Sequence, residues 1–151
     1  MKMRDAKPDD FDFVLSGRVE IAEAEDFVIP NMANEKRRVK RAIAERKVRV
    51  AVGDDGRRLG FLWFIRDSVT PFGIDYGEFG EEYYWVDYVF TAKEARGKGI
   101  GSALYEDLLA LAKKNGVKKI MCDVFTVNKI SGRFHRKLGF KPMLEIYCKE
   151  A

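Results

Sequence analysis

The pattern of apolar and polar residues predicts a series of short strands and helices. After an opening strand, a first helix is expected to begin at Asp9 or Asp10, where apolar side chains recur at helical spacing. Gly17 weakens the prediction of one unbroken helix in this segment. A second, mostly exposed helix is predicted over residues 33–47, with Asn34 as its N-cap.

The middle of the chain predicts a hairpin and a buried strand. Two β-rich runs flank Asp54, Asp55 and Gly56, and Asp-Gly between such runs is a strong hairpin signal. Residues 67–82 form a connection that is longer than a hairpin needs, and long loops are often functional. Residues 83–91, "YYWVDYVFT", are apolar on both faces and therefore predict a central strand.

The rest of the chain completes the predicted fold. It predicts a helix over residues 100–115, a strand over 117–127, a short helix over 128–137 and a last strand over 143–150. This order is typical of an α+β (α/β) fold, in which a mixed, mostly antiparallel central sheet carries helices on both faces. A single domain over residues 1–151 is expected from the length.

Composition excludes some classes of protein. The chain is 46% hydrophobic and 34% charged, as in globular domains, and no apolar run approaches the roughly 20 residues of a membrane helix. The charged opening segment does not resemble a secretory signal. Cys122 and Cys148 form no CxxC pair and are expected to be reduced thiols. We therefore expect a cytoplasmic protein that binds no metal and no membrane.

The placement of charge is more informative than the net charge of +4. Residues 113–141 are strongly basic, with Asp123 as their only acid, whereas residues 67–82 are acidic and contain no Lys or Arg. One region can attract an anion and the other a cation. The alternative is that they are two solvated faces of opposite sign.

The segment "ARGKGIGSAL", residues 95–104, joins the buried strand to the helix that follows. The N-terminus of a helix offers unpaired N–H groups and suits a phosphate. Gly97 and Gly99 allow the backbone to approach an anion, and Arg96 and Lys98 add positive charge. The P-loop pattern fails because no Lys precedes Ser102, and the dinucleotide pattern GxGxxG fails because Ser102 stands at its last glycine.

A third pattern fits the chain better. "RGKGIG" has the form R-x-x-G-x-G and resembles the acetyl-CoA loop of the GCN5-related N-acetyltransferases, the GNAT family. Downstream, "NKISGRFHRKLGFKP" is similar to that family's N-x-x-A-x-x-x-Y-x-x-x-G-F segment. The matching positions are Asn128, Ser131, Leu138, Gly139 and Phe140. The order of elements also matches, so the resemblance covers almost the whole chain and implies the acyl-CoA N-acyltransferase (GNAT) fold.

The resemblance implies where acetyl-CoA binds. The loop residues expected to bind its pyrophosphate are Arg96, Gly97, Lys98, Gly99, Ile100, Gly101 and Ser102. The pantetheine arm is expected beside Val89, Phe90 and Thr91, where a backbone N–H would polarise the thioester carbonyl as an oxyanion hole does. Asn128 would meet this arm from the other side or cap its helix. Ser131, Phe134 and Lys137 complete the expected acetyl-CoA site, and the basic surface around Lys137 would receive the 3′-phospho-ADP end.

Attack of an amine on a thioester requires a proton acceptor and a proton donor. His135 stands where the family usually has a tyrosine acid, and an imidazolium can serve as that acid. Asp87 and Asp123 are the candidate bases, with Asp87 preferred because it lies in the most apolar strand. Glu81 and Glu82 are weaker candidates, and the amine can also bind already neutral. Structural pairing of the two aspartates with a neighbouring Arg or with the backbone is the alternative.

The expected acceptor is a primary amine on a peptide, protein, polyamine or other small molecule. The region around residues 20–35 and the 67–82 loop are both acidic, which suits a cation. Their candidate residues are Glu20, Glu23, Glu25, Asp26, Tyr76, Phe79, Tyr83, Tyr84 and Trp85. The competing hypotheses are a non-catalytic acyl-CoA sensor and a basic nucleic-acid-binding module, although no nucleic acid is expected. The resemblance also implies that an edge strand or the last strand can form a homodimer.

Overall fold

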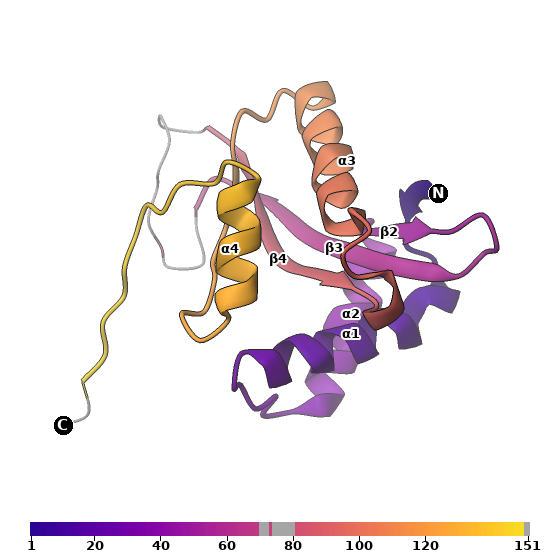
Figure 1. The fold of residues 1–151 in the computed structure, drawn as a ribbon, viewed down its shortest axis with the longest axis horizontal. Coiled ribbons are helices and arrows are strands. Elements are labelled where there is room, and N and C mark those ends of the chain that lie inside the picture. The colour runs from indigo at the N-terminus through magenta and orange to yellow at the C-terminus, as the bar shows by residue number, and fades with distance from the viewer. Residues whose placement is uncertain (70–72, 74–80, 150–151) are drawn as a thin grey trace.

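The computed structural model describes residues 1–69, 73 and 81–149. Two helices follow the first strand and three strands follow them, and Figure 1 shows α1 and α2 below the central sheet and α3 above it. The strands are β1 (Lys2–Asp5), β2 (Val48–Val52), β3 (Arg58–Asp67), β4 (Tyr83–Thr91) and β5 (Ile120–Cys122). The α-helices are α1 (Phe11–Ala24), α2 (Met32–Ala44), α3 (Ile100–Lys114) and α4 (Lys129–Lys137), and short 3₁₀ turns cover Pro8–Asp10 and Lys93–Ala95.

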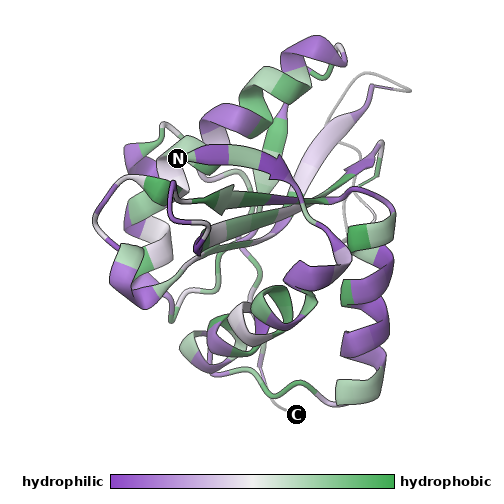
Figure 2. Cartoon of the chain, turned by 90° about the vertical axis from the view of Figure 1, so that its right-hand side faces the viewer, coloured by the Kyte–Doolittle hydropathy of each residue, from purple (hydrophilic) through white to green (hydrophobic). Residues whose placement is uncertain are grey.

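The described strands form one sheet in the order β1-β2-β3-β4-β5. The first four strands pair antiparallel, and β5 pairs parallel to β4 after the crossover through α3. This confirms the predicted mixed, mostly antiparallel sheet with helices on both faces. Figure 2 shows apolar residues concentrated along the strands in the middle, while the surrounding helices carry polar residues on their outer sides.

The core lies between the sheet and the helices on its two faces. Phe61 on β3, Phe90 on β4 and Leu104 on α3 are buried at its centre. Gly17 does not interrupt α1, because a Cβ at this position would stand 2.5 Å from the Phe61 ring and 2.8 Å from that of Phe90. The glycine is therefore required for the close approach of α1 to the sheet.

Three predicted details differ from the structure. The N-cap of α2 is Asn31 and not Asn34, and its side chain accepts a hydrogen bond from the backbone N–H of Asn34. The predicted last strand is not formed among the described residues, since residues 141–149 are exposed and belong to no strand. The strand expected over residues 117–127 is confined to the three residues of β5.

Asp10 is fully buried where β1 meets the start of α1. Its carboxylate accepts hydrogen bonds from Arg4 at 2.5 Å, from Arg58 at 2.7 Å and from the backbone N–H of Lys7 at 2.7 Å. Asp10 occupies the predicted N-cap position, but its side chain binds these groups and not the helix N–H groups. These bonds hold the pKa of the carboxyl far below its usual range against the opposing effect of burial.

Replacing Asp10 by Asn is expected to lower the free energy of unfolding by about 2–3 kcal/mol, because hydrogen bonds to charged groups contribute about that much. Asp9→Asn is the matched control. The exposed Asp9 carboxylate accepts one long hydrogen bond from Arg58, at 3.2 Å, so we expect the free energy of unfolding to change by less than about 0.5 kcal/mol. Urea unfolding measures both. The Asp10 contribution should be present above about pH 4 and be lost as the pH falls further, because its folded pKa lies below the unfolded one. Equal effects of the two substitutions would contradict this assignment.

Candidate functional site

The sheet opens between β4 and β5. The two strands pair only from Tyr84 to Val86 on β4, so no described strand lies on the β5 side of residues 87–91. Because the backbone N–H of Ala92 donates to Leu59 on β3, the alternation of an antiparallel ladder directs the backbone groups of Val89 and Thr91 to the open side. The gap can therefore receive an extended chain that bonds to β4 as a strand does.

The glycine-rich segment lies at the end of this gap. Gly97 and Gly99 have φ angles of 74° and 78°, and a Cβ at either position would meet no atom within 4 Å. Gly99 is the N-cap of α3 and makes no side-chain capping bond. The first backbone N–H groups of α3 are consequently left open at the positive end of a helix dipole, an arrangement that fits a phosphate group.

Gly101 has a packing role in addition to the backbone role that its place in the motif implies. It lies inside α3, and a Cβ there would stand 2.9 Å from the ring of Phe134 on α4. This glycine lets α4 pack against the first turn of α3. Phe134, which is predicted to bind the cofactor, therefore lies beside the glycine loop. The side chain of Ile100 is buried, so only the backbone of this residue can contact a cofactor.

Asp87 is the additional residue of a β-bulge. The register passes from Trp63 opposite Tyr88 to Phe64 opposite Val86, so Asp87 has no partner on β3. The pKa of Asp87 is raised to about 6, chiefly by burial; the charge of Arg38 opposes this shift and the charge of Asp123 contributes to it. A carboxyl with this pKa is ionised at neutral pH and can still accept a proton, which suits a general base.

Two more carboxylates lie near Asp87. Asp123 is exposed just beyond β5, and its charge acts on both Asp87 and Glu25. Burial raises the pKa of Glu25, which accepts a hydrogen bond from the side chain of Asn128. Asn128 also caps α4 by accepting from the backbone N–H of Ser131 at 3.0 Å, which confirms its predicted capping role. Glu25 after α1, Asp87 on β4 and Asp123 after β5 therefore bring three acids close to one another beside the β4–β5 gap.

His135 is buried between α3 and α4. Its Nδ1 lies 2.9 Å from the carbonyl oxygen of Ser131, which can only accept, so Nδ1 carries a proton. Its Nε2 lies 2.7 Å from the hydroxyl of Tyr105 and accepts a hydrogen bond from it. Burial lowers the pKa of His135. A neutral ring with both nitrogens engaged does not favour His135 as the proton donor.

The ionisation of His135 can be observed directly, because it is the only histidine in the chain. In a titration followed by the NMR shift of its Cε1 proton, the midpoint is expected below the ordinary value of about 6.5, since burial penalises the imidazolium. Tyr105→Phe removes the donor to Nε2 without changing the ring's burial and serves as the comparison. A midpoint at or above 6.5 in the unmodified protein would contradict a neutral, buried ring.

Other predicted site residues lie elsewhere or are engaged. Tyr83, Tyr84 and Trp85 are buried in the sheet, which corrects their assignment to an exposed aromatic acceptor surface. Glu81 pairs with Lys118 and Lys119. Tyr76 and Phe79 lie outside the described residues.

Around the glycine loop, the guanidinium of Arg96 bonds Glu20 on α1 at 2.9 Å and the carbonyl of Thr91 at 3.1 Å. Lys98 donates to the carbonyl of Glu94 at 2.8 Å. Lys137 is exposed at the end of α4. Arg96 is therefore directed toward α1 and not toward the backbone N–H groups at the start of α3.

Phe90 and Glu82 also depart from their predicted places. The side chain of Phe90 is buried in the core and its ring stacks on Phe61. Because backbone groups alternate in direction along β4, those of Phe90 point toward β3 and away from the gap. Phe90 therefore supports β4 through the core and does not face the gap. Glu82 pairs with Arg66 and is not placed beside Asp87. Ser102, on the first turn of α3, is half-buried next to the loop as expected.

The sequence reasoning missed a buried arginine. Arg18 is 5% exposed, its Nε lies 3.1 Å from a carboxylate oxygen of Glu35, and its guanidinium stacks 4.3 Å from the centre of the Tyr88 ring. Its position could have been found, because Arg18 stands four residues from both Val14 and Ala22 on the buried stripe of α1. A charged side chain on a buried helix face needs a polar partner, so Arg18 indicates a polar contact where α1 packs against β4.

Three further observations concern metal ligands, membrane helices and the Cys122 thiol. Among the described residues, no cluster of His, Cys, Asp or Glu side chains is arranged to hold a metal ion. No described helix is long and apolar enough to cross a membrane. Burial also raises the pKa of the Cys122 thiol to about 12, so this cysteine is not an activated nucleophile.

Comparison with known structures reveals the same fold in several acetyltransferases. An aminoglycoside antibiotic 6′-N-acetyltransferase from Acinetobacter haemolyticus is 16% identical, with a TM-score of 0.77 over 100% of this chain and 98% of that chain. A GCN5-related N-acetyltransferase from Ralstonia eutropha gives 14% identity and a TM-score of 0.78 over 99% and 97% of the two chains. A ribosomal-protein-alanine N-acetyltransferase from Brucella melitensis gives 16% and 0.70, with both chains fully covered.

At these identities the structural matches show the fold, and the family follows from a separate comparison. No curated protein sequence matches the chain. The profile of the Acetyltransferase (GNAT) family matches residues 18–140, a segment that contains the β4–β5 gap, the glycine loop and α4. The chain therefore belongs to the GNAT family of acetyltransferases.

Proposed function

We propose that the protein is an N-acetyltransferase that moves the acetyl group of acetyl-CoA to a primary amine in a ternary complex. The observation that carries this proposal is the gap beside Val89 and Thr91, which leads to the open N–H groups at Gly99. The GNAT family uses acetyl-CoA, and a gap that accepts an extended arm next to a phosphate-binding helix end has the shape of that molecule.

The residues around the gap suggest how the reaction proceeds. The backbone N–H of Val89 points to the open side and is positioned to stabilise negative charge on the thioester oxygen in the transition state. Asp87, two residues earlier, accepts the proton that the attacking amine loses. The new C–N bond forms as the C–S bond breaks, and the departing thiolate takes a proton from water, because His135 is neutral and engaged.

The acceptor is proposed to be a cation before it reacts. Glu25, Asp87 and Asp123 place negative charge on the side of the gap opposite the glycine loop, whereas the buried Arg18 is neutralised by Glu35. A protonated amine would be attracted to these acids and would lose its extra proton to water, so that Asp87 stays ionised and accepts the second proton as the C–N bond forms. Amines on peptides, polyamines and small molecules all satisfy this chemistry.

A two-stage experiment tests the proposal. Acetyl-CoA is titrated by calorimetry, and free thiol is then measured in the presence of a panel of peptide, polyamine and aminosugar amines. Thiol release above the rate of hydrolysis supports the enzyme. Binding without release for every amine supports the non-catalytic acyl-CoA sensor, and binding of an oligonucleotide without binding of acetyl-CoA supports the nucleic-acid-binding module.

A further inference from the structure

Two aromatic side chains bridge the connections beside the acidic side of the gap. Phe27 follows α1 and Phe125 follows β5, and the centroids of their rings lie 6.5 Å apart. Both rings stay partly exposed, Phe27 at 43% and Phe125 at 46%. In Figure 1 the end of α1 lies below the loop that leads into α4, in agreement with this contact. The paired rings present apolar surface to water, which is unfavourable unless another molecule covers it.

Two exposed valines extend this apolar surface along the same connections. Val28 follows Phe27 directly, and Val127 stands two residues after Phe125. Both valines are exposed. We call Phe27, Val28, Phe125 and Val127 the apolar rim. Apolar side chains on the surface beside a functional gap are typical of a site that binds another molecule.

The apolar rim adjoins two of the acids described above. Glu25 precedes Phe27 by two residues, and Asp123 precedes Phe125 by two. The carboxylate of Glu25 also accepts a hydrogen bond from the side chain of Asn128, so the two connections are joined a second time. Each connection therefore offers a carboxylate and an aromatic ring together.

A buried guanidinium links the apolar rim to the strand that carries the candidate base. The guanidinium carbon of Arg18 lies 5.8 Å from the centre of the Phe27 ring and 4.3 Å from that of Tyr88. Tyr88 follows Asp87 on β4, and the charge of Arg18 acts on both Asp87 and Glu25. Only one side chain therefore separates the rim from β4 at the candidate base. An acceptor whose amine reaches Asp87 would place its remaining atoms against the rim.

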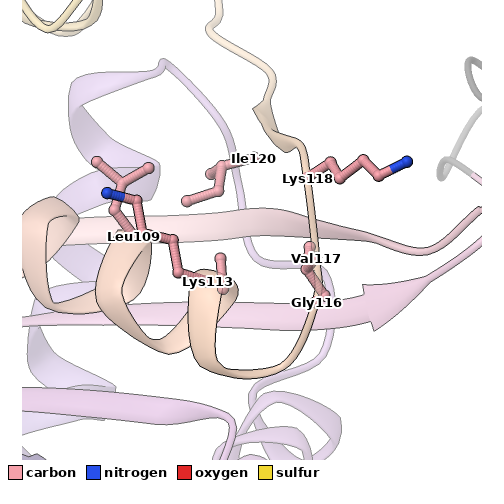
Figure 3. Close-up of a pocket in the computed structure, with 7 residues that line it drawn as sticks. Leu109, Lys113, Gly116, Val117, Lys118 and Ile120 are labelled. Atoms are coloured by element: carbon pink, nitrogen blue, oxygen red, sulfur yellow. The ribbon is translucent and has the colours of Figure 1, made fainter.

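Another apolar surface of the molecule has the opposite charge. A hollow of about 520 Å³ lies between the end of α3 and the start of β5, and its apolar lining includes Leu109, Val117 and Ile120. Figure 3 shows Lys113 and Lys118 on its two sides. These cations would repel a protonated amine, whereas the acids beside the apolar rim would attract it. Charge therefore favours the rim as the surface that meets a cationic acceptor.

We propose that the acceptor carries an apolar group close to its primary amine, and that the apolar rim binds this group. The inference rests on the proposed function and names the class of amine that reacts. A small arylalkylamine and a peptide that begins with an apolar residue both have this chemistry. Polyamines and aminosugars instead place charges or hydroxyl groups at this position, and these groups would lose water without gaining partners.

Matched amines test this preference. At saturating acetyl-CoA, kcat/KM is expected to be at least about tenfold higher for phenylethylamine than for ethanolamine, because only the first amine covers the two rings. Phe125→Ser should lower the ratio of these two values roughly tenfold. Leu109→Ser is the matched control, since Leu109 is 48% exposed in the hollow beside α3, and it should leave the ratio unchanged. Circular dichroism verifies that both variants remain folded.

Two tripeptides identify the source of the apolar group. Phe-Gly-Gly and Gly-Gly-Gly repeat the comparison with a peptide N-terminus. A larger ratio for the peptides than for the small amines assigns a peptide as the acceptor, and a larger ratio for the small amines assigns a small molecule. Either result supports the inference.

A binding measurement distinguishes failure of this inference from failure of the proposed function. Saturation-transfer NMR with phenylethylamine in the presence of CoA reports contact without turnover, and the signal should weaken in Phe125→Ser but not in Leu109→Ser. Such binding without thiol release from acetyl-CoA for any amine supports the apolar rim and contradicts the proposed function. Thiol release that is as fast with ethanolamine as with phenylethylamine overturns the inference and leaves the proposed function in place. Absence of phenylethylamine binding at millimolar concentration also overturns the inference.

Discussion

Replacement of Asp87 by Asn is expected to lower kcat/KM by about 10²- to 10⁴-fold, the usual range for loss of a general base. The amide has nearly the shape of the carboxyl but cannot accept the amine's proton. In the unmodified protein, kcat/KM should fall as the pH drops through about 6, because burial raises the pKa of Asp87 to about 6 and only its ionised form is active. The Asn variant should lose this acid limb.

Asp123→Asn provides the comparison for this result. It removes a charge from the same side of the gap, but Asp123 is exposed and lies beyond β5. Its removal should lower the pKa of Asp87, since the charge of Asp123 raises it, and should shift the acid limb to lower pH. If Asp123→Asn abolishes the limb while Asp87→Asn retains it, the base is Asp123 and the assignment made above is wrong.

Gly99→Val is expected to raise the KM or dissociation constant for acetyl-CoA by about 5- to 30-fold. A left-handed conformation costs a residue with a Cβ roughly 1–2 kcal/mol, and relief of that strain moves the N–H groups at the start of α3. The side chain would also stand in the space where a phosphate approaches the helix. Calorimetric titration with acetyl-CoA measures the effect apart from turnover.

Gly56→Val is the control that distinguishes backbone strain from a direct effect on acetyl-CoA binding. Gly56 has a φ of 82° in the β2–β3 hairpin, and a Cβ there would also meet no atom within 4 Å. The two substitutions therefore impose similar strain at distant places. Gly56→Val should lower the melting temperature and leave acetyl-CoA affinity unchanged. Equal losses of affinity would mean that the glycine loop does not hold the cofactor.

Much of the fold was predictable because its signals are local. The Asp-Gly turn at residues 55–56, the apolar run of β4 and the cap at Asn128 each determine their own conformation. The errors arise where contacts between residues that are distant in sequence determine the local structure. Gly17 is tolerated inside α1 because two core rings lie against it, and the apolar run over residues 143–149 indicates a strand but cannot name its partner.

In the candidate site, too, the features with a local sequence signal were predictable and the others were not. The positive φ angles at Gly97 and Gly99 and the gap beside Val89 agree with the loop motif and the strand order. The bulge at Asp87 left no local signal, because it results from pairing with β3. The state of His135 was equally hidden, since it depends on Tyr105, thirty positions away on another helix.

The short pairing between β4 and β5 has a consequence for the energetics of the protein. Only three register pairs join β5 to β4, and α4 is held mainly by its contacts with α3 around Tyr105 and by the hydrogen bond between Asn128 and Glu25. A unit with so short a strand pairing can open without global unfolding. The proposed acetyl-CoA arm would add backbone bonds to β4 where the sheet has none, so its binding free energy would also stabilise this unit. Release of the product is therefore expected to be coupled to local opening of β5 and α4.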